Sequence, residues 1–277
     1  MAVNIFNGGF SQSALIRTVG ADFPLDEYSA CWRVYFNDVR TGQFITPHCV
    51  APTTFSGGSD YAVCFRGSGG ISTKWAIGSD GNDTYHASLE PVAGRWYRQV
   101  FRRRRRGIND YEQLFYFDVP TEDFVSRNDT DAATTGATTT LSWGAPQYTL
   151  EEGIDGRIAD PWIFKGALPL GFLFRQTLSW QLVDARYRAA VWGNWRCLNE
   201  GDLMDRSGHG RHLSIVDSSG TGVDVTSIAH APSFLSWRES VGRYDFDAGV
   251  ITAAGNVAGP LVSGPVLKSL VYGGLVG

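Results

Sequence analysis

Residues 28–36 read Tyr-Ser-Ala-Cys-Trp-Arg-Val-Tyr-Phe, a run without glycine or proline. In a β-strand, successive side chains point to opposite faces. One face of a strand here is apolar throughout and consists of Ala30, Trp32, Val34 and Phe36. The other face is mixed and consists of Cys31, Arg33 and Tyr35. The pattern predicts a strand that buries one face in a core.

Further segments of the same character follow at short intervals. Each is rich in β-branched or aromatic residues and is bounded by Gly, Pro, Asn or Asp. They are residues 30–37, 61–66, 73–78, 96–103, 114–119 and 138–143. This spacing predicts an all-β protein with an antiparallel sandwich or jelly roll. A 3.6-residue apolar period also predicts a helix, or a pair of helical turns, within residues 170–190.

The composition fits a folded chain with a sizeable core. The 277 residues are 43% hydrophobic and 19% charged, which excludes a disordered chain or a coiled coil. The net charge of −4 gives no argument for a nucleic-acid or anionic-membrane partner. The cysteines form no CxxC pair, and we expect buried thiols at Cys31, Cys49 and Cys64.

The sequence suggests four regions. We expect an N-terminal segment (1–21), a jelly roll (22–178), a helical linker with a turn-rich segment (179–214) and a C-terminal extension (215–277). The start of the chain lacks the pattern of a secretory signal. Residues 250–267 are apolar and uncharged, but their Gly and Pro residues argue against a membrane-spanning helix. The extension is therefore interpreted as an extended arm.

Four segments carry a family resemblance. Residues 93–100 (AGRWYRQV), 113–118 (QLFYFD), 140–144 (TLSWG) and 156–168 (GRIADPWIFKGAL) occur in the order and spacing of four motifs. Together they resemble the laminin G-like/concanavalin A-like lectin/glucanase superfamily, especially its phage-type members. The match covers roughly residues 22–175, and it implies a concanavalin A-like jelly roll.

A further motif lies where the family pattern does not place it. Residues 195–210 (WRCLNEGDLMDRSGHG) resemble the sequence that usually begins such a domain, yet here they follow one. Two interpretations remain open. The segment is the remnant of a truncated second copy, or it supplies strands and a turn that complete the first.

The most conspicuous local feature is a run of five arginines. The run consists of Arg102, Arg103, Arg104, Arg105 and Arg106, and Gly107–Asp110 follows it as an expected hairpin loop. We expect the run to project at a sheet edge and to form a protein interface. The alternative is ion pairing with Asp110 and Glu112 across the hairpin, together with protection of the edge.

Two kinds of ligand site are candidates. Aromatic side chains near strand ends are candidates for stacking on sugars, and they are Trp75, Tyr85, Trp143 and Tyr148. Lectin-like relatives often hold Ca²⁺ at the sandwich rim, and the loop oxygens that would serve belong to Asp80, Asn82 and Asp83. No other cofactor is expected. His209 and His212 are interpreted as turn residues rather than metal ligands.

No catalytic constellation is expected. The nearest match to a glycosidase motif is Glu200–Asp205, which lies in the turn-rich segment and replaces the last glutamate of the motif with aspartate. A glycoside hydrolase that uses Glu200 and Asp202 is the least favoured alternative. Ser207 does not lie in the G-x-S-x-G pattern of a nucleophilic serine.

These observations lead to two functional hypotheses. The first is a non-enzymatic virion protein, a capsid decoration or another head or tail component, made in the host cytoplasm. It would display the jelly roll and would assemble through its C-terminal arm with copies of itself and with other virion proteins. The alternative is an adhesion module that binds host surface glycans, with or without calcium. Neither hypothesis involves a membrane partner or nucleic acid.

Overall fold

The computed structural model describes most of the first 217 residues and two short strands beyond them. The described residues are 3–5, 13–39, 44–52, 61–68, 71–79, 82–85, 90–107, 110–118, 123–129, 139–145, 153–176, 183–197, 203–217, 243–245 and 250–252. The chain divides into two compact units, Met1–Ala229 and His230–Gly277. Among the described residues, no helix has the length and apolar character needed to cross a membrane.

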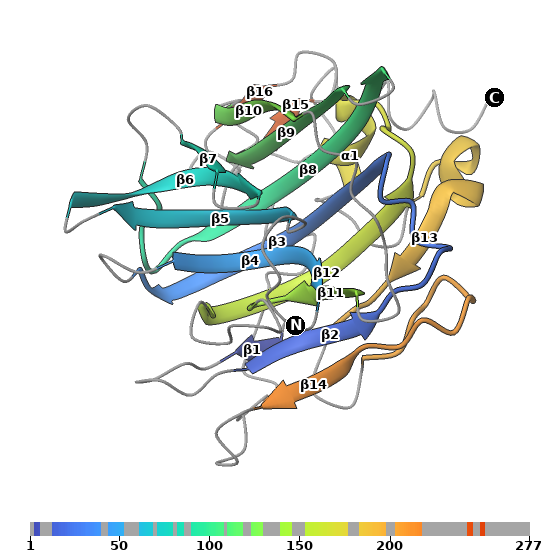
Figure 1. Ribbon diagram of the computed structural model, residues 1–277, viewed down its shortest axis with the longest axis horizontal. Coiled ribbons are helices and arrows are strands. Elements are labelled where there is room, and N and C mark those ends of the chain that lie inside the picture. The colour runs from blue at the N-terminus through green and yellow to red at the C-terminus, as the bar shows by residue number, and fades with distance from the viewer. Residues whose placement is uncertain are drawn as a thin grey trace, which may run out of the picture. The chain divides into compact units, whose positions relative to one another are not determined.

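The first sheet of the larger unit has the order β1-β12-β3-β8-β9-β10, and β13 also pairs with β12 (Figure 1). Its strands are β1 (Val3–Ile5), β12 (Asp155–Lys165), β3 (Tyr28–Asp38), β8 (Trp96–Gly107), β9 (Asp110–Asp118), β10 (Asp123–Asp129) and β13 (Val191–Asn194). The long strands β12, β3 and β8 form its centre, and every pairing is antiparallel.

The second sheet has the order β14-β2-β11-β4-β5-β6-β7 and is also antiparallel. Its strands are β14 (Ser214–Asp217), β2 (Ser13–Thr18), β11 (Thr139–Trp143), β4 (Phe44–Pro52), β5 (Tyr61–Ser68), β6 (Ile71–Ser79) and β7 (Asn82–Tyr85). The two sheets pack face to face, which confirms the predicted all-β jelly-roll sandwich.

Aromatic side chains from both sheets fill the core between them. Trp32 of β3 lies 5.1 Å from Trp143 of β11, and Trp75 of β6 lies 5.0 Å from Tyr97 of β8, measured between ring centroids. The predicted apolar face of residues 28–36 belongs entirely to this core. Because large aromatic rings bury the most apolar area per residue, these contacts dominate the stabilisation of the sandwich.

A second apolar cluster covers part of the opposite, outer face of the first sheet. Helix α1 (Leu170–Gln176) and the 3-10 helix η3 (Ala185–Ala190) pack there. Phe172 and Leu173 of α1 are buried against Cys31, Val100 and Trp162. The two elements match the predicted pair of helical turns. Cys31 and Cys49 are buried thiols, as expected, while the side chain of Cys64 lies outside the described part.

Strands from beyond the expected jelly-roll boundaries complete both sheets. β2 lies before residue 22 and pairs with β11, whereas β13 and β14 lie after residue 178 and pair with β12 and β2. The sandwich therefore extends on both sides of residues 22–178. Their sequences, SALIRT, VWGN and SIVD, do not alternate between apolar and polar residues, so an alternating pattern could not reveal them. Residues 195–210 lie between β13 and β14, and their described part contains one isolated bridge, from Trp195 to Asp205, so the choice between the two interpretations of the segment stays open.

The smaller unit contains one described hairpin. Its strands are β15 (Arg243–Asp245) and β16 (Val250–Thr252), which pair antiparallel. Apart from β14 and this hairpin, residues 215–277 lie outside the described residues, and so does the predicted arm.

Candidate functional site

The sequence-predicted aromatic residues divide into buried rings and rings outside the described part. Trp75 is 1% exposed and Trp143 is 0% exposed. Trp143 stacks on His48 with a centroid distance of 4.3 Å. Because both indoles point between the sheets, neither offers a surface for a sugar ring, which corrects the expectation for them. Tyr85 ends β7, but its side chain is outside the described part, as is all of Tyr148.

The predicted calcium loop is only partly described. Asn82 and Asp83 lie in β7 and pair with Ser79 and Gly78 of β6, so their backbone belongs to a hairpin ladder. Asp80 lies outside the described residues. Within the part of the chain that the structure describes, no group of three His, Cys, Asp or Glu residues is placed to hold a metal. Calcium binding by this loop stays a prediction.

The arginine run does not lie at a sheet edge. It forms the second half of β8, and β9 and β10 lie beyond β8 in the sheet order. Arg103 is 0% exposed on the core side, whereas Arg104, Arg105 and Arg106 are exposed. The expectation of an edge position is therefore corrected, because two further strands continue the sheet past β8.

Of the ion pairs expected as the alternative role of this run, those with Glu112 are present, while the side chain of Asp110 lies outside the described part. Glu112 of β9 pairs with Arg102 at 3.2 Å and also with Arg106. Arg105 pairs with Asp26 at 3.4 Å. The run thus joins the β8–β9 hairpin to the loop before β3, a local structural role in which carboxylates compensate the guanidinium charge.

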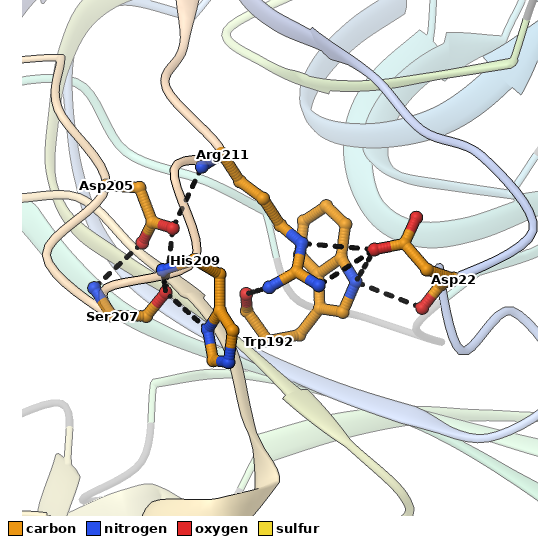
Figure 2. Close-up of polar contacts among 6 residues, drawn as sticks. All are labelled: Asp22, Trp192, Asp205, Ser207, His209 and Arg211. Atoms are coloured by element: carbon orange, nitrogen blue, oxygen red, sulfur yellow. Dashed lines mark hydrogen bonds and ion pairs between the residues drawn. The ribbon is translucent and has the colours of Figure 1, made fainter.

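A tight turn at residues 203–213 is organised by one carboxylate (Figure 2). Asp205 accepts hydrogen bonds from the backbone N–H groups of Ser207 (2.9 Å) and Arg211 (3.0 Å), and from Ser207 Oγ at 2.7 Å. The backbone N–H of Asn194 also donates to Asp205, at 3.1 Å. Burial acts to raise the pKa of Asp205, but these hydrogen bonds, led by that from the Ser207 hydroxyl, outweigh it and lower the pKa. The ionised carboxylate therefore holds the turn and β13 together.

Arg211 fastens the same turn to the loop before β3. Its guanidinium donates to Asp22 Oδ2 through Nε (3.1 Å) and Nη2 (2.8 Å), and to the carbonyl of Trp192 through Nη1 (2.7 Å). It also lies 4.5 Å from the centroid of the Trp192 ring. The indole N–H of Trp192 donates to the backbone carbonyl of Asp22 at 3.1 Å. Arg211 and Asp22, which are 189 positions apart in the sequence, are thus in direct contact.

Ser207 and His209 lie beside Asp205 in an order that does not suit nucleophilic catalysis. The Ser207 hydroxyl donates to Asp205, and its oxygen lies 2.9 Å from His209 Nδ1. In a catalytic triad the histidine stands between serine and aspartate and takes the serine proton. Here the serine stands in the middle and its proton is directed to the carboxylate. The arrangement stabilises the turn, and Glu200 and Asp202 lie outside the described residues.

The outer face of the first sheet carries a different group of side chains beyond the apolar cluster. Arg157 of β12, Tyr35 of β3 and Trp96 of β8 are paired across adjacent strands. All three are partly exposed. The guanidinium carbon of Arg157 lies 5.1 Å from the Tyr35 ring centroid, and the two aromatic rings are 5.6 Å apart and tilted by 53°. We call these three residues the aromatic–arginine platform.

A buried layer of charge lies in the next row of the same three strands. Arg33 of β3 is directly opposite Arg98 of β8 and forms an ion pair with Asp160 of β12. Burial first, and then the neighbouring charge of Arg98, lower the pKa of Arg33 to about 10. Asp160 has a φ of +48° within a β-bulge, a conformation that Asp tolerates better than most residues. The bulge accompanies the pairing of its carboxylate with Arg33.

Two glycines allow the backbone around the platform to approach closely. A Cβ at Gly156 would overlap the backbone carbonyl oxygen of Tyr35. Gly94 adopts a φ of +76°, and its N–H donates to the carbonyl of Phe36 at 2.8 Å. That turn delivers the chain into β8 with Trp96 at its first position. Both glycines belong to the motifs that carry the family resemblance.

The sequence analysis did not select Tyr35, Trp96 or Arg157 as site residues. The available signal was the alternation in residues 28–36, which puts Arg33 and Tyr35 opposite the core face. It could not place Trp96 and Arg157 beside them, because that requires the order and register of β12, β3 and β8.

Comparison with known proteins supports the fold. The match to a putative carbohydrate-binding protein from Bacteroides ovatus covers 78% of this chain and 59% of the Bacteroides chain, with a TM-score of 0.51 and 11% identity. The match to a SAP-like pentraxin from Limulus polyphemus covers 78% of this chain and 93% of the pentraxin chain, with a TM-score of 0.48 and 11% identity. No family model matches the chain, and neither does any curated protein sequence.

A phage protein is also similar in structure. Tailspike protein 2 from an Escherichia coli O157:H7 bacteriophage matches 71% of this chain, with a TM-score of 0.44 and 11% identity. The match spans 28% of the tailspike. An identity this low says nothing of function. The chain is a jelly-roll sandwich, and any ligand is inferred from the chain's own residues.

Proposed function

We propose that the larger unit is a glycan-binding module and that the aromatic–arginine platform is its contact surface. The observation that carries the proposal is the placement of Tyr35 and Trp96 side by side on one sheet face, partly exposed and 5.6 Å apart. Aromatic rings with one accessible face stack on the C–H groups of sugar rings, while neighbouring polar groups bond the hydroxyls.

The fold supports this proposal. The Bacteroides ovatus protein, which shares it, is described as a putative carbohydrate-binding protein. A rigid sheet also holds contact residues more firmly than a loop does, so binding requires little ordering.

A glycan array with the intact chain tests the proposal, followed by calorimetry on any saccharide that binds. We expect Trp96→Ala to weaken binding at least tenfold, which corresponds to about 1.4 kcal/mol. Phe124→Ala is the matched control, because Phe124 is 47% exposed on β10 of the same sheet but is not part of the platform. An array without a hit, or equal losses from both variants, would contradict the proposal.

We further propose the virion role as a second function, with self-association through residues 215–277. The support is the resemblance to phage-type members and the Gly- and Val-rich composition of residues 215–277. Light scattering of the full chain and of a chain ending at Ala229, where the larger unit ends, tests it. Oligomers that persist without residues 230–277 would contradict assembly through that part of the extension.

Calcium is proposed only as an accessory to glycan binding through Asp80, Asn82 and Asp83. Repeating the calorimetry with and without EDTA tests it, and unchanged affinity would exclude a calcium requirement.

A further inference from the structure

We propose that the platform selects acidic saccharides, with Arg157 contacting a carboxylate or sulfate group of the ligand. This inference rests on the proposed glycan-binding function and adds the charge class of the ligand.

The first argument is the concentration of positive charge on three strands. Arg157 lies in the platform row, and Arg33 and Arg98 lie in the next row, about 7 Å along the strands. The carboxylate of Asp160 pairs with Arg33, and that of Asp155, on the far side of the platform, accepts a hydrogen bond from Asn37 at 2.8 Å. Asp38 of β3 lies opposite Asp155, so three carboxylates accompany the three guanidinium groups. Asp38 and Asp155 both lie beyond the platform, on the side away from Arg33 and Arg98. The positive charge is therefore concentrated from Arg157 toward Arg33 and Arg98, and an anion on the platform is attracted toward it.

The second argument is the cost of the buried arginine pair. Like charges directly opposite each other on neighbouring strands are destabilising, and Arg33 and Arg98 are 7% and 2% exposed. A sandwich needs only apolar or neutral residues here, as the neighbouring row with Cys31 and Val100 shows. Destabilising arrangements that break such local rules concentrate at functional sites. An anionic ligand would offset the repulsion when it binds.

The third argument is the geometry of Arg157 and the two rings. Arg157 and Trp96 are separated by two strand spacings, about 10 Å, with Tyr35 between them. A saccharide that stacks on Trp96 therefore extends over Tyr35 toward a guanidinium. The planar fork of that group matches a carboxylate or sulfate with two parallel hydrogen bonds. The contact with the Tyr35 ring restricts the orientation of the Arg157 guanidinium group.

Calorimetry with the intact chain and three probes tests the inference. The probes are trigalacturonate, which carries carboxylates, a heparin-derived tetrasaccharide, which carries sulfates, and maltotriose, which is neutral. The variants are Arg157→Gln and, as a matched control, Arg104→Gln. Arg104 is exposed on the same strand and face as Trp96, about 26 Å away, and its substitution removes the same charge. Circular dichroism confirms that each variant is folded.

We expect at least one acidic probe to bind tenfold or more tightly than maltotriose, with an affinity that falls as salt rises. Arg157→Gln should weaken that probe at least tenfold, whereas Arg104→Gln should change it less than twofold. The stronger of the two acidic probes identifies the anionic group.

Two outcomes overturn the inference in different ways. If maltotriose binds as well as the acidic probes, or if Trp96→Ala abolishes binding while Arg157→Gln does not affect it, acidic selectivity is wrong and the glycan-binding function stands. If none of the probes binds and the glycan array has no hit, the proposed function fails together with the inference.

Discussion

The outer face of the first sheet has two halves with different chemistry on the same three strands. In the covered half, Trp162 of β12, Cys31 of β3 and Val100 of β8 are apolar and lie beneath α1 and η3. In the charged half, the same strands carry Asp160, Arg33 and Arg98, followed by the aromatic–arginine platform. The pairing of β3 with β8 is continuous across both halves, whereas the pairing of β12 with β3 is interrupted between them by the bulge at Asp160.

The two halves differ in their contribution to stability: the covered half stabilises the fold through apolar packing, whereas the charged half places polar groups where their burial is costly. Burying apolar side chains under a helix stabilises the covered half at about 25 cal/mol per Å² of surface removed from water. Burying guanidinium groups carries a desolvation cost that ion pairing offsets only in part. The covered half thus serves stability, and we assign the charged half to binding.

The largest effect is expected from the buried ion pair of the charged half. Asp160→Asn keeps a residue that tolerates positive φ but removes the carboxylate beside buried Arg33. Loss of one partner of a buried pair costs about 3–5 kcal/mol. Urea denaturation measures this cost. A loss below 1 kcal/mol would show that the charged half does not depend on the pair.

The next effect concerns the covered half. Leu173 of α1 is 0% exposed, so Leu173→Ala should lower the free energy of unfolding by about 2–5 kcal/mol. The ligand affinity of the folded variant should stay within twofold, because Leu173 lies outside the platform. Denaturation and calorimetry on the same sample measure both quantities. An affinity loss matching that of Trp96→Ala would remove the functional distinction between the halves.

A smaller effect is expected at the turn that fixes β13, the strand at the margin of the covered half. Asp205→Ala leaves four donors without their acceptor and should cost about 1–3 kcal/mol. Because folding lowers the pKa of Asp205, its contribution is complete above the ordinary carboxyl pKa of about 3.9 and is lost as pH falls below that value. Stability between pH 2 and pH 6 should therefore vary less in Asp205→Asn than in the wild type, and identical slopes would refute this role.

The smallest effect on stability is expected in the platform itself. Trp96→Ala removes a partly exposed ring and its contact with Tyr35, at a cost of about 1 kcal/mol. Thermal unfolding measures this change, and Trp96→Phe should restore most of it. A loss as large as that of Leu173→Ala would mean that Trp96 is a core residue and that the platform has a structural role.

The fold was largely predictable, whereas the candidate site was not. Alternation in residues 28–36 assigned the core face correctly, because the period of a strand is a local property. The same local reasoning placed Trp75 and Trp143 near strand ends, but it could not decide whether their rings point into the core or toward solvent. Both rings point into the core. The arginine run was also assigned to an edge, since the number of strands beyond β8 depends on pairings that lie far apart in the chain.

The sequence by itself determined that this chain forms an antiparallel sandwich, and it determined which face of β3 is buried. Only the tertiary structure decided that Arg157, Tyr35 and Trp96 stand side by side and that Arg211 joins Asp22 to Trp192. The physical reason is distance along the chain. Hydrophobic period and turn chemistry act over a few residues, but these groups come from β12, β3, β8 and the two ends of the sandwich. They meet only after sheet order and register have been established.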